Sequence, residues 1–341
     1  MVWQANPQTL PSERLWLIII EAPASPCFPE KIHELWHFHM ITFRRCLGWS
    51  VWSLILVSPV AAEELFKAKP LTASGQFTEG IEGPACDANG NVYAVNFAVQ
   101  QTIGVVTPDG RGQQFVKLPG NSVGNGIRFD SRGRMLVADY VGHNVLRIDM
   151  KTRKIEIFAH QAEMNQPNDL AIGPDDTLYA SDPNWAKGTG QLWRISPDGR
   201  VKRLAKDMGT TNGIEVSPDG KRLYVNESVQ RNIWVFDLSA DGIANKRLLT
   251  RFSDHGFDGM RCDTQGNLYV TRYGKGTVVK LSPDGKILQE IDVLGAKPSN
   301  ICFGGPDGRT AYVTEVEHRR LVQFRVDHPG VSWARLQRVP Q

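Results

Sequence analysis

Short runs in which apolar and polar residues alternate recur along most of the chain, and this pattern predicts β-strands. Successive runs are joined in pairs by tight turns, and the paired unit occurs six times. The six units are EGPACDANGNVYAV from Glu82, NGIRFDSRGRMLVA from Asn125, NDLAIGPDDTLYAS from Asn168, NGIEVSPDGKRLYV from Asn212, DGMRCDTQGNLYVT from Asp258 and NICFGGPDGRTAYV from Asn300. Their first residues are 43, 43, 44, 46 and 42 positions apart. Strand-like units with a period in the forties are typical of a β-propeller.

The turn inside each unit supports the same conclusion. Eight residues after the first position, five of the six units have glycine and the third has Asp176, as a hairpin turn with positive φ favours. We therefore predict an all-β, six-bladed β-propeller whose blades start near residues 82, 125, 168, 212, 258 and 300. The sixth unit offers only three strands, so we expect a strand within Leu71–Glu79 to supply the fourth and close the ring. The tail after Asp327 is expected to be peripheral.

The first residue of each unit is the main chemical signal. In a closed ring, six equivalent inner strands would point these side chains at one central axis. All six carry oxygen, two are acids, and none is histidine or cysteine: Glu82, Asn125, Asn168, Asn212, Asp258 and Asn300. Such a set suits a divalent cation, with Ca²⁺ the best fit and Mg²⁺, Mn²⁺ or Zn²⁺ as alternatives. The simpler interpretation is that strand ends facing a wet channel carry polar residues.

A second set of polar residues follows fourteen positions later and is expected on the same face. Asp182, Arg272 and Glu315 are candidates for substrate contact, or alternatively rim charges that pair with one another. A cation such as Arg272 at the mouth would favour an anionic substrate. His255, three residues before Asp258, is expected near the mouth, where it would contact substrate or be an ordinary loop histidine.

Composition narrows the class of protein. The chain has 341 residues, 22% charged and 41% hydrophobic, which suits one large β domain. Its net charge of +3 is small and its basic residues are dispersed, so we expect no nucleic-acid partner. Cys86, Cys262 and Cys302 fall in predicted inner strands and are interpreted as buried thiols, with a Cys86–Cys302 disulfide left open.

The first 62 residues differ from the rest. Residues 1–39 share nothing with the repeats and are interpreted as an untranslated or disordered leader. Residues 40–62 have the basic start, short apolar run and small-residue end of a signal peptide, leaving 63–341 as the propeller. The apolar run is too short to span a bilayer, although an uncleaved anchor is the alternative. We therefore expect an exported, periplasmic protein with no stable membrane insertion after cleavage.

Four motifs resemble a known family. EGP at Glu82, PND around Asn168, NGI at Asn212 and DGM at Asp258 are similar to those of the senescence-marker-protein/gluconolactonase (regucalcin-like) six-bladed propellers. The resemblance runs from about Gly80 to Val326. It implies a calcium-type ion held by Glu82, Asn168, Asn212 and Asp258, and hydrolysis of a lactone. Family members that open sugar lactones often have arginine two residues before the PND asparagine, where this chain has Gln166, a departure that counts against sugar-lactone specificity.

The implied chemistry assigns roles to these residues. We expect Asp258 to act as general base on the attacking water, or as a nucleophile, while Asn125 and Asn300 hold substrate or a bound water. The substrate is then a small lactone or ester, and the sequence does not indicate an oligomeric state. Two other classes remain open: another ester or organophosphate hydrolase or a strictosidine-synthase-like enzyme on the same scaffold, and a non-catalytic exported ligand- or protein-binding propeller.

Overall fold

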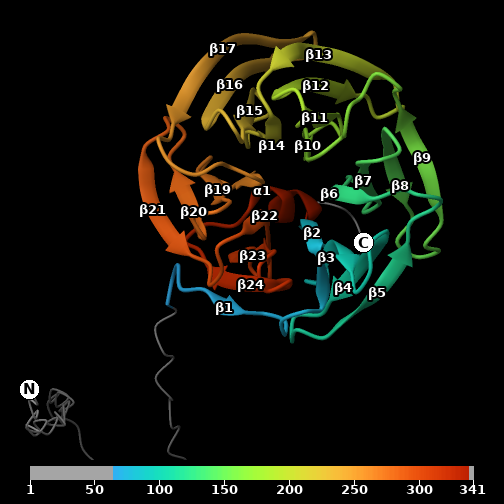
Figure 1. The fold of residues 1–341 in the computed structure, drawn as a ribbon, viewed down its shortest axis with the longest axis vertical. Coiled ribbons are helices and arrows are strands. Elements are labelled where there is room, and N and C mark those ends of the chain that lie inside the picture. Colours follow the sequence, from blue (N-terminus) through green and yellow to red (C-terminus); the bar gives the residue numbers. More distant parts are fainter. Residues whose placement is uncertain (1–63, 338–341) are drawn as a thin grey trace, which may run out of the picture. The chain divides into compact units, whose positions relative to one another are not determined.

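The computed structural model describes residues 64–337, and in this range the chain forms a six-bladed β-propeller (Figure 1). Six antiparallel sheets of four strands surround a central axis, which confirms the predicted fold. The predicted leader (1–39) and signal peptide (40–62) lie outside the described residues. No helix within 64–337 has the length and apolar character needed to span a bilayer.

The blades follow one another in chain order. Blade 1 consists of β2 (Phe77–Cys86), β3 (Val92–Phe97), β4 (Thr102–Val106) and β5 (Gly112–Lys117). Blade 2 consists of β6 (Gly124–Phe129), β7 (Met135–Asp139), β8 (Asn144–Ile148) and β9 (Ile155–His160). Blade 3 consists of β10 (Leu170–Ile172), β11 (Leu178–Asn184), β12 (Thr189–Ile195) and β13 (Val201–Met208).

The second half repeats this order. Blade 4 consists of β14 (Thr211–Val216), β15 (Arg222–Glu227), β16 (Asn232–Ser239) and β17 (Gly242–Arg251). Blade 5 consists of β18 (Met260–Cys262), β19 (Leu268–Arg272), β20 (Thr277–Leu281) and β21 (Ile287–Asp292). Blade 6 consists of β22 (Pro298–Gly304), β23 (Thr310–Glu315), β24 (Arg320–Arg325) and, at its outer edge, β1 (Lys69–Pro70).

Burial changes from the inside of each blade to the outside. The second strands, such as β7 and β19, are buried along their whole length because neighbouring blades cover both of their faces. The outer strand β21 (ILQEID) is exposed at five of its six positions, and only Ile291 is buried. The hydrophobic core is therefore a set of apolar layers between adjacent blades, which fixes the inner strands around the axis.

The ring is closed by β1, as the three-stranded sixth unit predicted. Lys69 pairs with Gln323 and Pro70 with Val322 on β24. The position of the closing strand was predicted wrongly, however, because it lies before Leu71–Glu79. Residues 77–79 of that range instead begin β2, the inner strand of blade 1. The chain crosses from the outer edge of the ring to its axis between these two strands.

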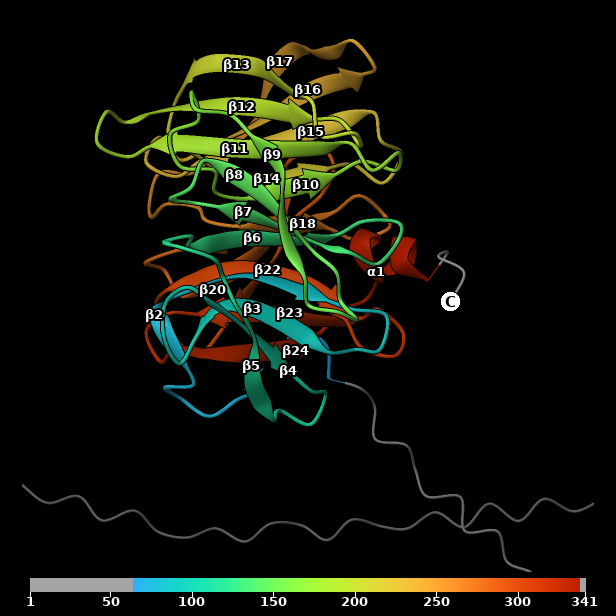
Figure 2. The same ribbon diagram turned by 90° about the vertical axis from the view of Figure 1, so that its right-hand side faces the viewer.

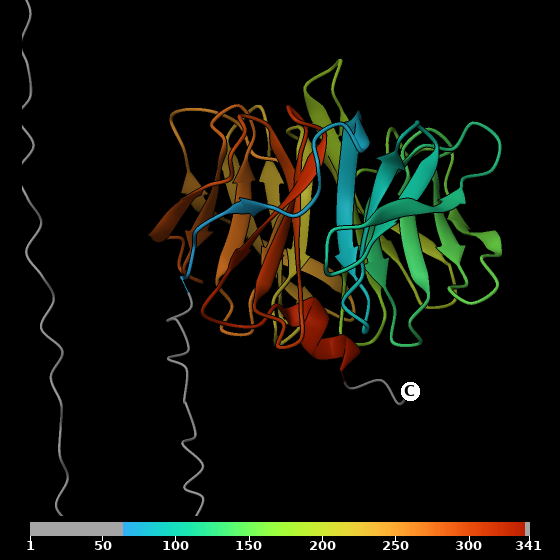
Figure 3. The same cartoon turned by 90° about the horizontal axis from the view of Figure 1, so that it is seen from below.

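The tail is not peripheral, because it forms helix α1 (Val331–Leu336) at one end of the central channel (Figures 2 and 3). Arg335 donates a hydrogen bond to the carbonyl of Ile172, at the end of an inner strand. Gly330 packs against Phe303 so closely that a Cβ there would meet the phenyl ring. Helix α1 thus covers the end of the channel where the inner strands finish.

The three cysteines of the propeller, Cys86, Cys262 and Cys302, are buried and free. Burial raises the pKa of each thiol, so these side chains act as small apolar groups of the core. The disulfide between Cys86 and Cys302 that the sequence left open is not formed in this structure.

Candidate metal centre

A cavity of about 670 Å³ opens at the other end of the channel, where the inner strands begin. Five of the six predicted axial residues line it: Glu82, Asn125, Asn168, Asn212 and Asp258. Asn125, Asn168, Asn212 and Asp258 stand close to the start of an inner strand, whereas Glu82 lies within the longer inner strand β2. All five occupy the same register of their blades. We call these positions the ring positions.

The sixth ring position is Ser299, and the prediction of Asn300 was wrong by one residue. Ile301 pairs with Val313 as Ile127 pairs with Val137 and Met260 with Val270, so the residue two places before Ile301 occupies the ring. Five residues separate the paired Phe129 and Met135 in blade 2, whereas seven separate Phe303 and Ala311 in blade 6. The ring position was predicted by counting back from the turn glycine, so the longer turn of blade 6 displaced the prediction by one residue. In a strand, a displacement of one residue moves the side chain to the other face of the sheet.

Asn300 has a different role, because it supports Glu82 from below. Its Nδ2 donates to Glu82 Oε2 over 2.9 Å, and its Oδ1 accepts from the backbone N–H of Ile301. The backbone N–H of Gly83 also donates to Glu82 Oε2. These two donors fix the Glu82 carboxylate at the cavity floor, and Asn300 itself does not line the cavity.

The two acids of the ring lie close enough to influence each other. Burial raises the pKa of Glu82 to about 7, and the nearby charge of Asp169 acts in the same direction. Burial likewise raises the pKa of Asp258 well above its ordinary value, with the charge of Glu82 as the next cause. Asp258 hydrogen-bonds to both Asn212 and Glu82. Two neighbouring buried carboxylates resist double ionisation unless a cation lies between them.

Two of the ring amides have a side-chain oxygen that lacks a hydrogen-bond partner among the described residues. Asn212 donates from Nδ2 to Ser228 Oγ over 3.0 Å, and Ser228 Oγ donates to the carbonyl of Phe257, so the amide orientation is fixed. Within residues 64–337, Asn212 Oδ1 and Asn125 Oδ1 are buried and accept no hydrogen bond. A buried oxygen without a partner is costly, and a bound cation would satisfy it.

Below the ring, a layer of charged groups fills the channel. Arg261 Nη1 lies 2.8 Å from Asp169 Oδ2, Arg128 Nη2 lies 3.4 Å from Asp169 Oδ1, and Glu215 lies 4.0 Å from Arg261. Burial opposes the ionisation of Asp169, but the two guanidinium groups outweigh it and hold the pKa of Asp169 below its ordinary value. Two cations and two carboxylates balance in this layer.

The ring above has no such balance. Among the ion pairs of the described residues, none includes Glu82 or Asp258. When both acids are ionised, the floor of the cavity carries two negative charges that one divalent cation would neutralise. The acids, the amide oxygens without partners and the absence of histidine and cysteine at the ring positions therefore fit a hard divalent cation.

Asp182 and Arg272 do not contact the cavity, which corrects the prediction of substrate contacts. Both are fully buried inside their blades. Asp182 accepts hydrogen bonds from the backbone N–H groups of Asn165 and Gln166 and from Trp193 Nε1, at 2.6 to 2.9 Å. Arg272 donates to Asp254 and lies with its guanidinium 4.1 Å from the ring centre of Phe252. These side chains hold the loops of their own blades.

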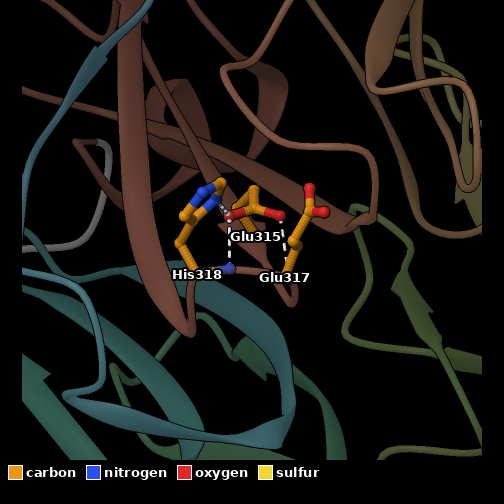
Figure 4. A group of neighbouring side chains, drawn as sticks. All are labelled: Glu315, Glu317 and His318. Carbon is orange, nitrogen blue, oxygen red and sulfur yellow. Dashed lines mark hydrogen bonds and ion pairs between the residues drawn. The ribbon is translucent and has the colours of Figure 1, made fainter.

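Glu315 serves its blade in the same way (Figure 4). Its carboxylate accepts from the backbone N–H groups of Glu317 and His318, at 2.8 and 2.9 Å, and contacts His318 Nδ1 at 2.8 Å. Glu317 in turn accepts from the N–H of Ala296. The ligand atoms of these three residues lie within 4.8 Å of one another. Because the loop already uses the oxygens of Glu315, this cluster is a loop support.

The upper wall of the cavity comes from loops. His255 lines it, as expected, together with Tyr140, Trp185, Val229 and Tyr273. The sequence analysis missed this apolar part of the wall, and it missed Ser228 behind Asn212. The four apolar wall residues each follow the second strand of their blade, and this shared position is a sequence signal from which the wall could have been predicted.

Comparison with known proteins agrees with this geometry. The chain is 27% identical over 304 residues to a gluconolactonase of Zymomonas mobilis subsp. mobilis, covering 78% of this chain and 85% of that protein. It is 31% identical over 175 residues to a 6-deoxy-6-sulfogluconolactonase of Pseudomonas putida, covering 49% of this chain and 60% of that protein. In fold, it is similar to the calcium-binding protein regucalcin of Agrobacterium tumefaciens, with a TM-score of 0.67 at 21% identity, covering 77% and 97% of the two chains.

A family assignment follows from the match over most of the propeller. Residues 80–317 match the SMP-30/Gluconolactonase/LRE-like region, and this range contains all six ring positions. The chain therefore belongs to the SMP-30/gluconolactonase/LRE-like family, as the EGP, PND, NGI and DGM motifs predicted.

Proposed function

We propose that the protein is a metal-dependent lactonase whose ion is held at the ring. The observation that carries the proposal is the convergence of Glu82 and Asp258, both with raised pKa values, on amide oxygens that lack partners at the floor of one open cavity. Relatives named gluconolactonase and 6-deoxy-6-sulfogluconolactonase support the reaction class. A relative named regucalcin supports the use of a divalent metal.

Glu82, Asn168, Asn212 and Asp258 would hold the ion, and we propose Ca²⁺. Calcium accepts carboxylate and amide oxygens in flexible geometry, whereas Zn²⁺ prefers the nitrogen and sulfur ligands that the ring positions lack. When bound, the ion would act as a Lewis acid toward the carbonyl of the lactone.

Asp258 is the residue we propose as the general base. It lies at the cavity floor beside Asn212 and Glu82, where its carboxylate accepts a proton from the attacking water. The water oxygen bonds to the carbonyl carbon, the bond from that carbon to the ring oxygen breaks, and the ring oxygen takes the proton back from Asp258 and leaves as a hydroxyl group. The product is a hydroxy acid, which releases one proton at neutral pH. Asn125 and Ser299, which also line the cavity, remain to orient substrate by hydrogen bonding.

Proton release from a panel of lactones tests the proposal. We expect activity with Ca²⁺, loss of activity with a chelator, and loss in Asp258→Asn at matched calcium occupancy. A folded, calcium-loaded protein that opens no lactone would contradict the proposal and favour a non-catalytic binding propeller. Product analysis separates lactone opening from phosphotriester hydrolysis, because the latter releases no hydroxy acid.

We also propose that residues 40–62 direct export to the periplasm. The basic start and short apolar run support it. N-terminal sequencing of the mature protein from bacterial cells that express the full chain tests this, with cleavage expected near Glu63. A protein recovered only from the cytoplasm with residues 40–62 intact would contradict it.

A further inference from the structure

Apolar side chains surround the mouth of the cavity at one repeated position. In each blade, the loop between the second and third strands carries one of them, and we call these the rim positions: Val99, Val141, Trp185, Val229, Tyr273 and Val316. Residues 64–337 contain ten exposed large hydrophobic side chains, and five of the ten are rim residues. Apolar exposure on this protein is therefore concentrated around one opening, and such concentration marks a binding surface.

Four consecutive blades contribute their rim residue to the cavity wall: Trp185, Val229, Tyr273 and Val316. Tyr140 lines the wall next to Trp185 and is hydrogen-bonded to it. The rim residues of blades 1 and 2, Val99 and Val141, are exposed but do not line the cavity. The apolar wall thus covers one side of the opening, above the ring positions.

The long polar side chains of the same wall are not oriented by polar contacts. Glu79, Gln100, Arg231 and His255 line the cavity, and all four are exposed. Their side chains take part in no hydrogen bond or ion pair within residues 64–337. A polyhydroxylated ligand gains affinity from polar groups that are oriented in advance, and this wall offers few of them above the floor.

We propose that the substrate is a lactone with an apolar substituent, either alkyl or aryl. The substituent lies against Trp185, Val229 and Tyr273, while the carbonyl of the ring faces the floor. This inference rests on the proposed lactonase function and adds the class of substrate to it. The apolar wall then stabilises the substrate through burial of the substituent, and Trp185 contributes the largest surface.

The test compares lactones of one ring size in the calcium-loaded protein. One series carries an alkyl chain of increasing length, and one member carries hydroxyl groups instead. We expect kcat/KM to rise about threefold for each added methylene until the wall is covered. Trp185→Ala and Val229→Ser should flatten this rise. Val99→Ser is the matched control, because Val99 holds the same rim position but does not line the cavity, and it should leave the whole series unchanged.

A binding measurement separates this inference from the proposed function. Calorimetric titration with the corresponding alkyl lactams, in which a ring N–H replaces the ring oxygen, needs no catalysis. We expect affinity to increase with chain length and to fall about tenfold in Trp185→Ala. Faster opening of the hydroxylated lactone, with no dependence on chain length, would overturn the inference and leave the lactonase function intact. If no lactone is opened, the lactonase function fails, and lactam binding without chain-length dependence would then overturn the apolar site as well.

Discussion

Asn300 of blade 6 donates a hydrogen bond from Nδ2 to Glu82 Oε2 of blade 1 over 2.9 Å. The two residues are 218 positions apart in the sequence, yet they meet directly below the cavity floor. The last inner strand thus holds the carboxylate that the first inner strand presents to the ring. The contact between the last and the first blade therefore also positions a carboxylate of the candidate metal centre.

Asn300→Ala should weaken calcium binding about tenfold, because Glu82 loses the donor that fixes its carboxylate. Isothermal titration calorimetry with Ca²⁺ measures the effect. Asn89→Ala is a suitable control, since Asn89 is exposed in a turn remote from the ring. An unchanged affinity in a folded Asn300→Ala protein would show that Asn300 supports only the sheet.

Ser228→Ala should also lower calcium affinity about tenfold. Ser228 fixes the amide of Asn212, and without it Oδ1 is free to rotate away from the ring. Ser122→Ala offers a matched control, because Ser122 Oγ donates to the buried Asp139, which does not line the cavity. Both variants should lose a similar amount of stability. Only Ser228→Ala should lower the calcium affinity. Equal calcium affinities in the two variants would refute the role of Ser228 in orienting Asn212.

The metal-free protein should be more stable at pH 5 than at pH 8. Burial raises the pKa of Glu82 from 4.5 to about 7, so at neutral pH the folded state holds a proton that the unfolded chain has released. Stability is therefore fully present below about pH 4.5 and is lost as the pH rises through 7, by about 3 kcal/mol. Asp258 shifts in the same direction.

Denaturant unfolding at several pH values, in the presence of a chelator, measures this loss. Calcium should reverse the trend, because the ion favours the ionised acids, and its binding near pH 6 should release protons to the buffer. A pH-independent stability in the metal-free protein would show that Glu82 and Asp258 have ordinary pKa values.

Arg261→Met should destabilise the fold by about 3 kcal/mol or more, because Asp169 would remain buried with its nearest cation removed. Arg247→Met provides the comparison, since its ion pair with Asp237 lies at the surface, where solvent screens it, and should contribute little to stability. Urea denaturation of both variants measures the two losses in the free energy of unfolding. The second substitution Asp169→Asn should recover part of the loss in the Arg261→Met background, and no recovery would argue against the pair.

The sequence predicted the fold and five ring positions because the repeat spacing is nearly constant. It failed at Ser299 and Asn300, where a turn longer by two residues shifts the register. Spacing predicted the face on which Asp182 and Arg272 lie, but not that each side chain turns into its own blade. Sequence spacing indicates on which face of the propeller a residue lies, whereas the direction in which its side chain points depends on packing.

The charged layer below the ring was missed for a different reason. Asp169 and Arg261 are 92 residues apart, and no local pattern connects them. A signal was nevertheless present, because Arg128, Glu215 and Arg261 each occur three residues after a ring position. Comparison of every position in the aligned units, beyond the first one, would have predicted charges at a second level of the channel.

The pairing of Lys69 with Gln323 has a consequence for the biogenesis of the protein. Blade 6 is assembled from the beginning and the end of the chain, so the ring cannot close until translation has passed residue 323. Joining segments so distant in sequence is slow, because a long loop must be ordered before the contact forms. A nascent chain that lacks β24 therefore leaves β23 without its outer partner and β1 without the strand it pairs with, and this delay keeps the chain in an incompletely folded state for as long as synthesis lasts.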